Sequence, residues 1–163
     1  MKWILIIILL LGLASAAFAP VLKNHPALRP QKNWYGLEKE LPIIRAAAKR
    51  NGFDAEHPFF LILCAIRKTE DGPSGFEFGV RIAKGTTLET QADYAARTII
   101  KNWMRWNDSS LAKLHSGIKI KASTNVFIDY LADKYCPPKS DPQGNVNWKK
   151  NVKFWFKKFD CKP

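Results

Sequence analysis

Cysteine and histidine are scarce in this 163-residue chain, which contains three of each. His25, His57 and His115 lie far apart in the sequence and show no spacing typical of a metal-ligand set. Cys64 lies inside the apolar run FFLILCAI, where a cysteine usually serves as a small buried hydrophobic residue. The composition therefore argues against a metal centre and against a thiol nucleophile, and we expect neither a metal nor a cofactor.

Acidic residues are also few. The chain has 14 aspartates and glutamates against 26 lysines and arginines, which gives a net charge of +12 at pH 7. This excess is larger than solubility requires, and it favours polyanionic partners such as nucleic acid, anionic membranes or cell-wall polymers. The chain shows no repeats or low-complexity segments, and its length fits a single domain whose core needs no crosslinks.

One long hydrophobic run is present, at the N-terminus. Residues 1–19 begin with Met1 and Lys2, continue with WILIIILLLG and end in the small residues of ASAAFA. A short basic stretch, an apolar segment and an alanine-rich end are the layout of a secretory signal. If it is not cleaved, a run of this length can instead anchor the protein to a membrane. We therefore expect a secreted or periplasmic protein, with anchoring as the alternative, and export argues against nucleic acid as a partner.

The rest of the chain predicts a small, mainly helical domain. Residues 20–36 resemble an extended N-terminal arm, rich in proline, polar groups and aromatics, and residues 37–163 form the domain. Helices are expected over 41–51 and 58–70, after the capping box at 86–89, from Ser123 to the prolines at 137 and 138, and over 147–159. Residues 76–80 alternate aromatic and polar side chains, which favours a short strand or an ordered loop.

The helix expected over 58–70 ends in a carboxylate and breaks at once into the turn DGPSG. On a helix, Phe59, Ile62 and Ile66 share one face with Glu70, so Glu70 must lie where the core meets solvent. Lost hydration there disfavours the ionised form and raises the pKa of the carboxyl, which is how a general acid usable near neutral pH is made. The alternative is a solvated glutamate at a frayed helix end.

These residues resemble the lysozyme-like superfamily, in particular soluble lytic transglycosylases and phage-type peptidoglycan hydrolases. The segment AIRKTEDG at 65–72 is similar to the transglycosylase signature, in which a helix ends in Ala-Ile-x-x-x-Glu-Ser-Gly and the Glu is the catalytic acid. GFEFGV at 75–80 stands where the family has a second glycine-containing motif on the cleft floor, and TQADYAARTIIKNW at 90–103 fits the following helix. FIDYLADKYCPP and NWKKNVKFW resemble a C-terminal pattern of small secreted or phage-associated members. Asp71 replaces the usual Ser, and the second motif lacks the Gly-Leu-Met-Gln ending of typical transglycosylases.

The resemblance implies an α+β lysozyme-like domain with a minor β element beside the active-site cleft. It also implies cleavage of the β-1,4 bond between N-acetylmuramic acid and N-acetylglucosamine, with Glu70 as general acid. A hydrolase with two carboxylates would need a second acid, for which Glu77 is the best-placed candidate and Asp71 a poor second. A transglycosylase needs none, because the muramoyl 6-hydroxyl attacks in place of water, and both reactions stay open. Glu77 has another interpretation, as an exposed residue paired with a nearby Arg or Lys.

Sugar rings stack on aromatic faces, and four aromatic residues are candidates for substrate binding. Phe76, Phe78 and Tyr94 lie near the proposed cleft in sequence, and the superfamily often places a tyrosine near the acid from a later helix, for which Tyr130 is the candidate. Each could equally belong to the core. The expected partners are peptidoglycan glycan strands and the anionic cell-wall surface, bound by a monomer.

Cys136 and Cys161 bracket the last segment, and in an oxidising compartment they are the pair expected to form a disulfide. Two other functions remain open from the sequence. One is a non-catalytic protein of the same fold that binds cell wall or another polyanion. The other is a cationic protein that acts on membranes through its lysine-rich C-terminal helix, although the apolar face of that helix can equally dock onto its own core.

Overall fold

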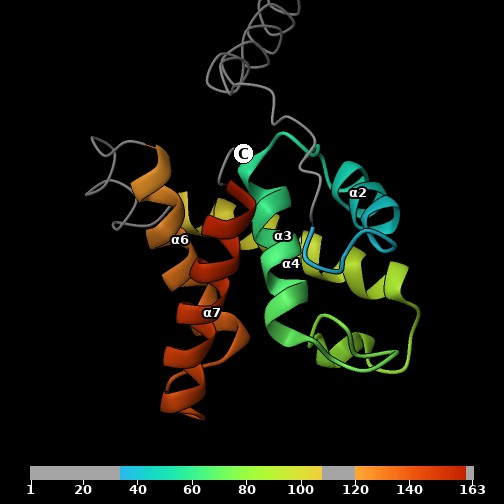
Figure 1. The fold of residues 1–163 in the computed structure, drawn as a ribbon. Helices are drawn as coiled ribbons and strands as arrows, with labels where there is room; N and C mark the ends of the chain where they lie inside the picture. The colour runs from blue at the N-terminus through green and yellow to red at the C-terminus, as the bar shows by residue number, and fades with distance from the viewer. Residues whose placement is uncertain (1–33, 108–119, 161–163) are drawn as a thin grey trace, which may run out of the picture.

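The computed structural model describes residues 34–107 and 120–160. Its elements in chain order are α2 (Leu41–Arg50), α3 (Pro58–Glu70), the short 3-10 helix η1 (Arg81–Ala83), α4 (Leu88–Asn107), α6 (Ile120–Tyr135) and α7 (Pro142–Asp160) (Figure 1). The prediction of a mainly α domain is confirmed. Over the residues described there is no strand, and the segment at 76–80 is an ordered loop made of turns.

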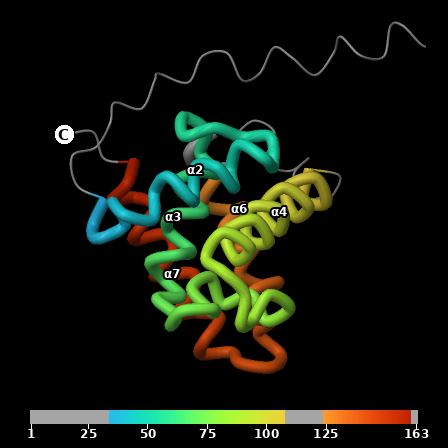
Figure 2. The backbone as a smooth tube through the Cα atoms, turned by 90° about the vertical axis from the view of Figure 1, so that its right-hand side faces the viewer, coloured from blue at the N-terminus to red at the C-terminus, as the bar shows by residue number. Residues whose placement is uncertain are grey.

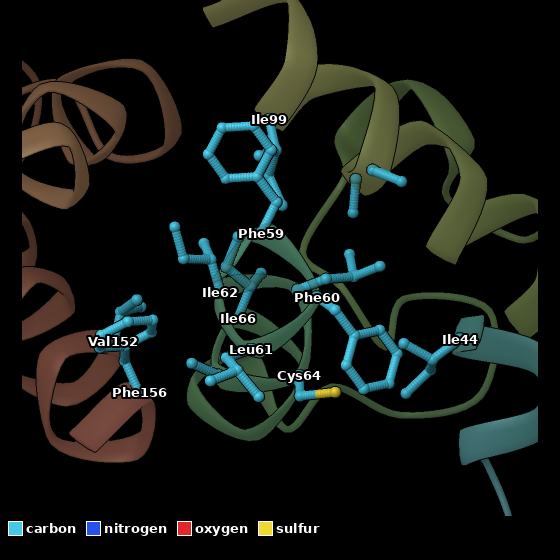
Figure 3. Packing of buried hydrophobic residues seen from close by; sticks show 14 of the residues in the cluster. Ile44, Phe59, Phe60, Leu61, Ile62, Cys64, Ile66, Ile99, Val152 and Phe156 are labelled. Carbon is cyan, nitrogen blue, oxygen red and sulfur yellow. The ribbon is translucent and has the colours of Figure 1, made fainter. Parts of the chain in front are cut away.

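Helix α3 is the centre of the domain. Every residue from Phe59 to Arg67 is buried, because its sequence is apolar on all sides. Figure 3 shows Ile44 of α2, Ile99 of α4 and Val152 of α7 approaching α3 from different directions. The residue types thus determine the architecture, since a helix that is apolar all round must be covered by several neighbours.

The neighbours of α3 differ in how they pack. Helix α7 makes the most extensive contact with α3 and also packs against α6, whereas α2 packs mainly against α4. Figures 1 and 2 show α3 between α7 on one side and the α2–α4 pair on the other. Over the described residues, no helix is long and apolar enough to span a membrane.

Two helices begin earlier than the sequence predicts. Helix α7 starts at Pro142 rather than near residue 147, because Asp141 caps it: the Gly144 amide donates to Asp141 Oδ1 at 2.7 Å. Residues 142–146, which precede the expected helix, therefore belong to the first turns of α7. Helix α6 starts at Ile120, so Ser123 lies inside it and is not its N-cap.

The domain also begins earlier than residue 37. Trp34 is buried, and its ring lies 5.4 Å from the Phe159 ring and 5.7 Å from the Phe60 ring. Its amide donates to Glu38 Oε1 at 2.8 Å. The last part of the expected arm thus belongs to the core, whereas residues 1–33, with the predicted signal or anchor over 1–19, lie outside the described residues.

Candidate active site

Glu70 is the last residue of helix α3. The helix begins where His57 Nδ1 accepts a hydrogen bond from the Phe59 amide at 3.2 Å, with Pro58 in the first turn. It ends because Asp71 adopts a left-handed conformation, with φ of 39°, before Gly72 and Pro73. Glu70 therefore lies at the junction between a rigid buried helix and a loop.

The end of α3 is fixed by an ion pair one turn before Glu70. The Arg67 guanidinium donates to both carboxylate oxygens of Glu40, at 2.7 and 2.8 Å. Arg67 is buried, and a paired, two-pronged contact of this kind is geometrically specific. The position of Glu70 is thus set by packing and by this pair together.

The Glu70 carboxylate has two close neighbours from distant parts of the chain. The Trp148 indole Nε1 donates to Glu70 Oε1 at 2.7 Å, and Trp148 is buried at the start of α7. On the other side lies Gly79, whose φ is 65°, and a Cβ atom there would overlap the carboxylate. Only glycine fits this position, because both the backbone conformation and the space require it.

Burial raises the pKa of the Glu70 carboxyl above its ordinary value, and the Trp148 indole opposes this by favouring the ionised form. The residue is half-buried, so it keeps some access to solvent. A partly desolvated carboxyl with one fixed donor has the properties required of a general acid.

Tyr135, the last residue of α6, completes the arrangement. Its ring stacks on Trp148 with centroids 5.1 Å apart and planes 25° apart. The Tyr135 hydroxyl oxygen is buried and has no hydrogen-bond partner among the residues described. Burial raises the pKa of Tyr135, and the nearby Glu70 charge raises it further. We call Glu70, Gly79, Tyr135 and Trp148 the Glu70 site.

The loop over residues 71–87 carries Gly79 and is held in place by Gln91 of α4. The fully buried Gln91 side chain donates through Nε2 to the carbonyls of Gly75 and Ala83, each at 2.6 Å. The Gly85 amide donates to the same Gly75 carbonyl at 2.7 Å. This loop is therefore ordered by tertiary hydrogen bonds rather than by a strand.

Glu77 makes a hydrogen bond within this loop. It is buried, and its Oε1 accepts a hydrogen bond from the Gly75 amide at 3.0 Å, while its Oε2 is buried without a partner among the described residues. This burial contradicts the interpretation of Glu77 as an exposed ion-pairing residue, whereas its role as a second acid stays a prediction. Asp71 is exposed and lies 3.6 Å from Arg67, so its carboxylate faces solvent.

The four predicted sugar-contacting residues have different outcomes. Phe78 is fully buried in the core, so the prediction that it contacts substrate is wrong. Phe76 is half-buried on the 71–87 loop, with the Lys84 ammonium 5.7 Å from its ring centroid, and it remains a candidate. Tyr94 lies beside Arg97 and Tyr130 beside Lys134, and no described hydrogen bond or ring contact joins either to the Glu70 site. The tyrosine that neighbours Glu70 from a later helix is Tyr135, not Tyr130.

The predicted disulfide lies partly outside the described residues, because Cys161 does. Cys64 is buried and Cys136 half-buried, both as free thiols. Cys136 directly follows α6, and its Sγ lies 3.9 Å from the carbonyl oxygen of Asp141, the residue before α7. The pairing of Cys136 with Cys161 therefore stays a prediction.

Sequence reasoning missed Gly79, Tyr135 and Trp148. Trp148 is 78 residues from Glu70, and the apolar stripe of α7 identified it only as a core residue. The usable signal was the pair of C-terminal segments KYCPP and NWKKN, which contain Tyr135 and Trp148. Among the described residues no three or more acidic, histidine or cysteine side chains cluster as a metal site would require.

The comparisons with known proteins identify no relative: no family model, no curated protein and no solved structure matches this chain.

Proposed function

We propose that this protein is an exported enzyme that cleaves the β-1,4 bond between N-acetylmuramic acid and N-acetylglucosamine in peptidoglycan, with Glu70 as general acid. The observation that carries the proposal is the state of the Glu70 carboxyl at the end of a buried helix. Its pKa is raised by burial, its orientation is held by Trp148, and it keeps partial access to solvent. The lysozyme-like resemblance of residues 65–80 supplies the substrate.

The hydrogen bond from Trp148 determines which oxygen of Glu70 can carry the proton. An indole N–H is only a donor, so Oε1 must accept in both protonation states. Because the carbonyl oxygen of a neutral carboxyl is a better acceptor than its hydroxyl oxygen, we assign the proton of the neutral acid to Oε2, the oxygen that faces Gly79. The glycosidic oxygen of a bound glycan is expected to approach Oε2, take this proton and leave, while positive charge develops at the anomeric carbon.

The surroundings of the other carboxylates favour a route that uses one acid. Glu77 is buried against its own loop, and Asp71 points into solvent beside Arg67. No described hydrogen bond joins either carboxylate to Glu70. In the one-acid route the muramoyl 6-hydroxyl attacks the anomeric carbon and gives its proton to the Glu70 carboxylate, which forms an anhydro product and regenerates the acid. The alternative product, a reducing end, would show hydrolysis.

The net charge of the chain and its N-terminal sequence support the proposed location of this reaction, at the cell wall outside the cytoplasm. A net charge of +12 suits an anionic cell wall, and residues 1–19 have the layout of a signal. We propose a secreted or periplasmic monomer that binds glycan strands, with Phe76 as the sugar-stacking candidate of the 71–87 loop. Anchoring by an uncleaved apolar segment is the alternative.

The decisive experiment compares Glu70→Gln with Asp71→Asn, two adjacent carboxylate-to-amide changes, in an assay of lysis of purified sacculi. Loss of general acid catalysis typically costs about 10²-fold or more, and we expect at least this loss for Glu70→Gln with binding to sacculi and circular dichroism unchanged. Asp71→Asn should keep nearly full activity. Mass spectrometry of the released fragments then distinguishes anhydro products from reducing ends.

Two outcomes would contradict the proposal. Full lytic activity in Glu70→Gln would exclude Glu70 as the acid. Tight binding of the wild-type protein to sacculi with no released fragments would support the non-catalytic cell-wall-binding function instead.

A further inference from the structure

A row of three aromatic rings reaches the surface along α7. Phe154 is 51% exposed and Tyr35 is 36% exposed, and the half-buried Trp155 lies between them. The Phe154 and Trp155 rings meet edge-on with centroids 5.2 Å apart, and the Trp155 and Tyr35 rings do so at 5.6 Å. Single exposed hydrophobic residues are common on protein surfaces, but a contiguous row of large rings indicates an interaction site.

Lysines surround this row. Lys150, Lys157 and Lys158 are four residues before, three after and four after Phe154 on α7, so all three share its exposed face. The Lys158 ammonium lies 5.5 Å from the Phe154 centroid. From α3, the Lys68 ammonium lies 5.2 Å from the Trp155 centroid.

The charge of α7 is unevenly compensated. On the side that faces α6, Lys149 pairs with Asp133 at 3.0 Å and Lys153 pairs with Asp129 at 2.6 Å. On the Phe154 side, neither Lys150 nor Lys157 has an acidic partner among the described residues. The charges of Lys150 and Lys157, on the face that carries the exposed rings, are thus left for an external anion.

The described part of the chain begins beside this face. The described chain starts at Trp34, whose ring lies 5.4 Å from that of Phe159 near the end of α7, and the next residue, Tyr35, is part of the row. Residues 1–19 are apolar enough to serve as a signal or an anchor. The Glu70 site includes Trp148, which precedes Phe154 and Trp155 on α7 and is not part of the row.

We propose that Tyr35, Phe154 and Trp155, together with Lys68, Lys150, Lys157 and Lys158, form a docking surface for an anionic lipid bilayer. We call these seven residues the aromatic–lysine patch. Aromatic rings partition into the headgroup region, and lysines around them bind lipid phosphates, so this composition matches a surface that rests on a membrane. The proposal does not depend on peptidoglycan cleavage, since none of these residues belongs to the Glu70 site.

The test measures co-sedimentation of the full chain with lipid vesicles. Ile7→Asp and Leu10→Asp are introduced into every protein, so that the apolar run cannot insert and mask the patch. We expect binding to vesicles of phosphatidylcholine with phosphatidylglycerol to exceed binding to pure phosphatidylcholine by at least about tenfold, because each lysine near an anionic surface contributes separately.

Phe154→Ser should weaken binding to the anionic vesicles about tenfold, as expected for a ring half-removed from water. Lys150→Gln combined with Lys157→Gln should weaken it by a similar factor.

Matched controls separate the patch from net charge and general apolarity. Met104→Ser removes another exposed hydrophobic side chain, and Lys49→Gln with Lys101→Gln removes two exposed lysines of α2 and α4. Neither control should change binding by more than about twofold if the patch is the site, since charges beyond a Debye length of the surface contribute little. Equal losses of vesicle binding in the control and patch variants would overturn the proposal. It would also be overturned if the protein binds soluble muropeptides instead of vesicles and Phe154→Ser abolishes that muropeptide binding.

Discussion

Glu70 acquires its chemical character from two residues that are distant in the sequence. Trp148 supplies a donor to one carboxylate oxygen, and Gly79 leaves room for the other. The sequence predicted the position of Glu70 and the direction of its pKa, because both follow from the apolar face of one helix. It could not predict Trp148 as the donor, because that contact exists only when α3 and α7 pack together.

Replacing Trp148 with phenylalanine tests the donor while keeping an aromatic ring in the site. The indole N–H favours ionised Glu70, so its loss should raise the pKa of Glu70 further. A hydrogen bond to a charged group contributes about 1.5 kcal/mol or more, which corresponds to about one pKa unit. The alkaline limb of the pH profile for lysis of sacculi should move to higher pH by this amount. Trp155→Phe, the same change on the same helix away from Glu70, should leave the profile in place.

A second measurement for Trp148→Phe does not require activity. Because the pKa of Glu70 is raised on folding, its contribution to stability is fully present below the unfolded pKa and is lost as pH rises through the folded pKa. In Trp148→Phe this loss should extend to higher pH, as measured by urea unfolding at a series of pH values. If neither the activity profile nor the stability curve moves, the indole does not influence the Glu70 carboxyl.

At the scale of elements, local sequence predicted α3 with its observed bounds, because the proline at its start and the turn DGPSG after its end are local signals. The conformation of the 71–87 loop was harder to predict. Alternation of aromatic and polar residues at 76–80 favoured either a strand or a loop, and the choice is made by Gln91, a residue of the next helix. The loop buries both Glu77 and Phe78. Alternation alone would place these neighbouring side chains on opposite faces, one buried and one exposed.

Glu77 provides the prediction for this loop. If Glu77 anchors the loop through its bond to the Gly75 amide, Glu77→Gln keeps an acceptor oxygen and should retain most lytic activity. Glu77→Ala leaves the buried amide without its partner and should lower the free energy of unfolding by about 1 to 3 kcal/mol. Urea unfolding and the sacculus assay measure the two effects separately. Loss of activity in Glu77→Gln as severe as that of Glu70→Gln, with normal stability, would instead identify Glu77 as a second catalytic carboxylate.

At the scale of the whole molecule, the two ends of the described chain are in contact, because Trp34 packs against Phe159 near the end of α7. Composition placed residues up to 36 in an extended arm, because proline and polar residues dominate that stretch. Burial of Trp34 between Phe60 and Phe159 depends on where α3 and α7 lie, which no local pattern reports. The domain boundary therefore follows from tertiary packing and lies at least three residues earlier than composition predicts.

Trp34→Ala in the full chain tests this boundary. Truncation of a buried tryptophan usually costs about 3 to 5 kcal/mol, so we expect a loss in that range in the free energy of unfolding. Met104→Ala, a truncation of a side chain that is 62% exposed on α4, is the control and should change stability by no more than about 0.5 kcal/mol. Both are measured by urea unfolding followed by circular dichroism. If Trp34→Ala is as stable as the wild-type protein, Trp34 belongs to an independent arm and the core begins after residue 36. A large loss means instead that Trp34 belongs to the core formed with α3 and α7, directly before Tyr35 of the aromatic–lysine patch.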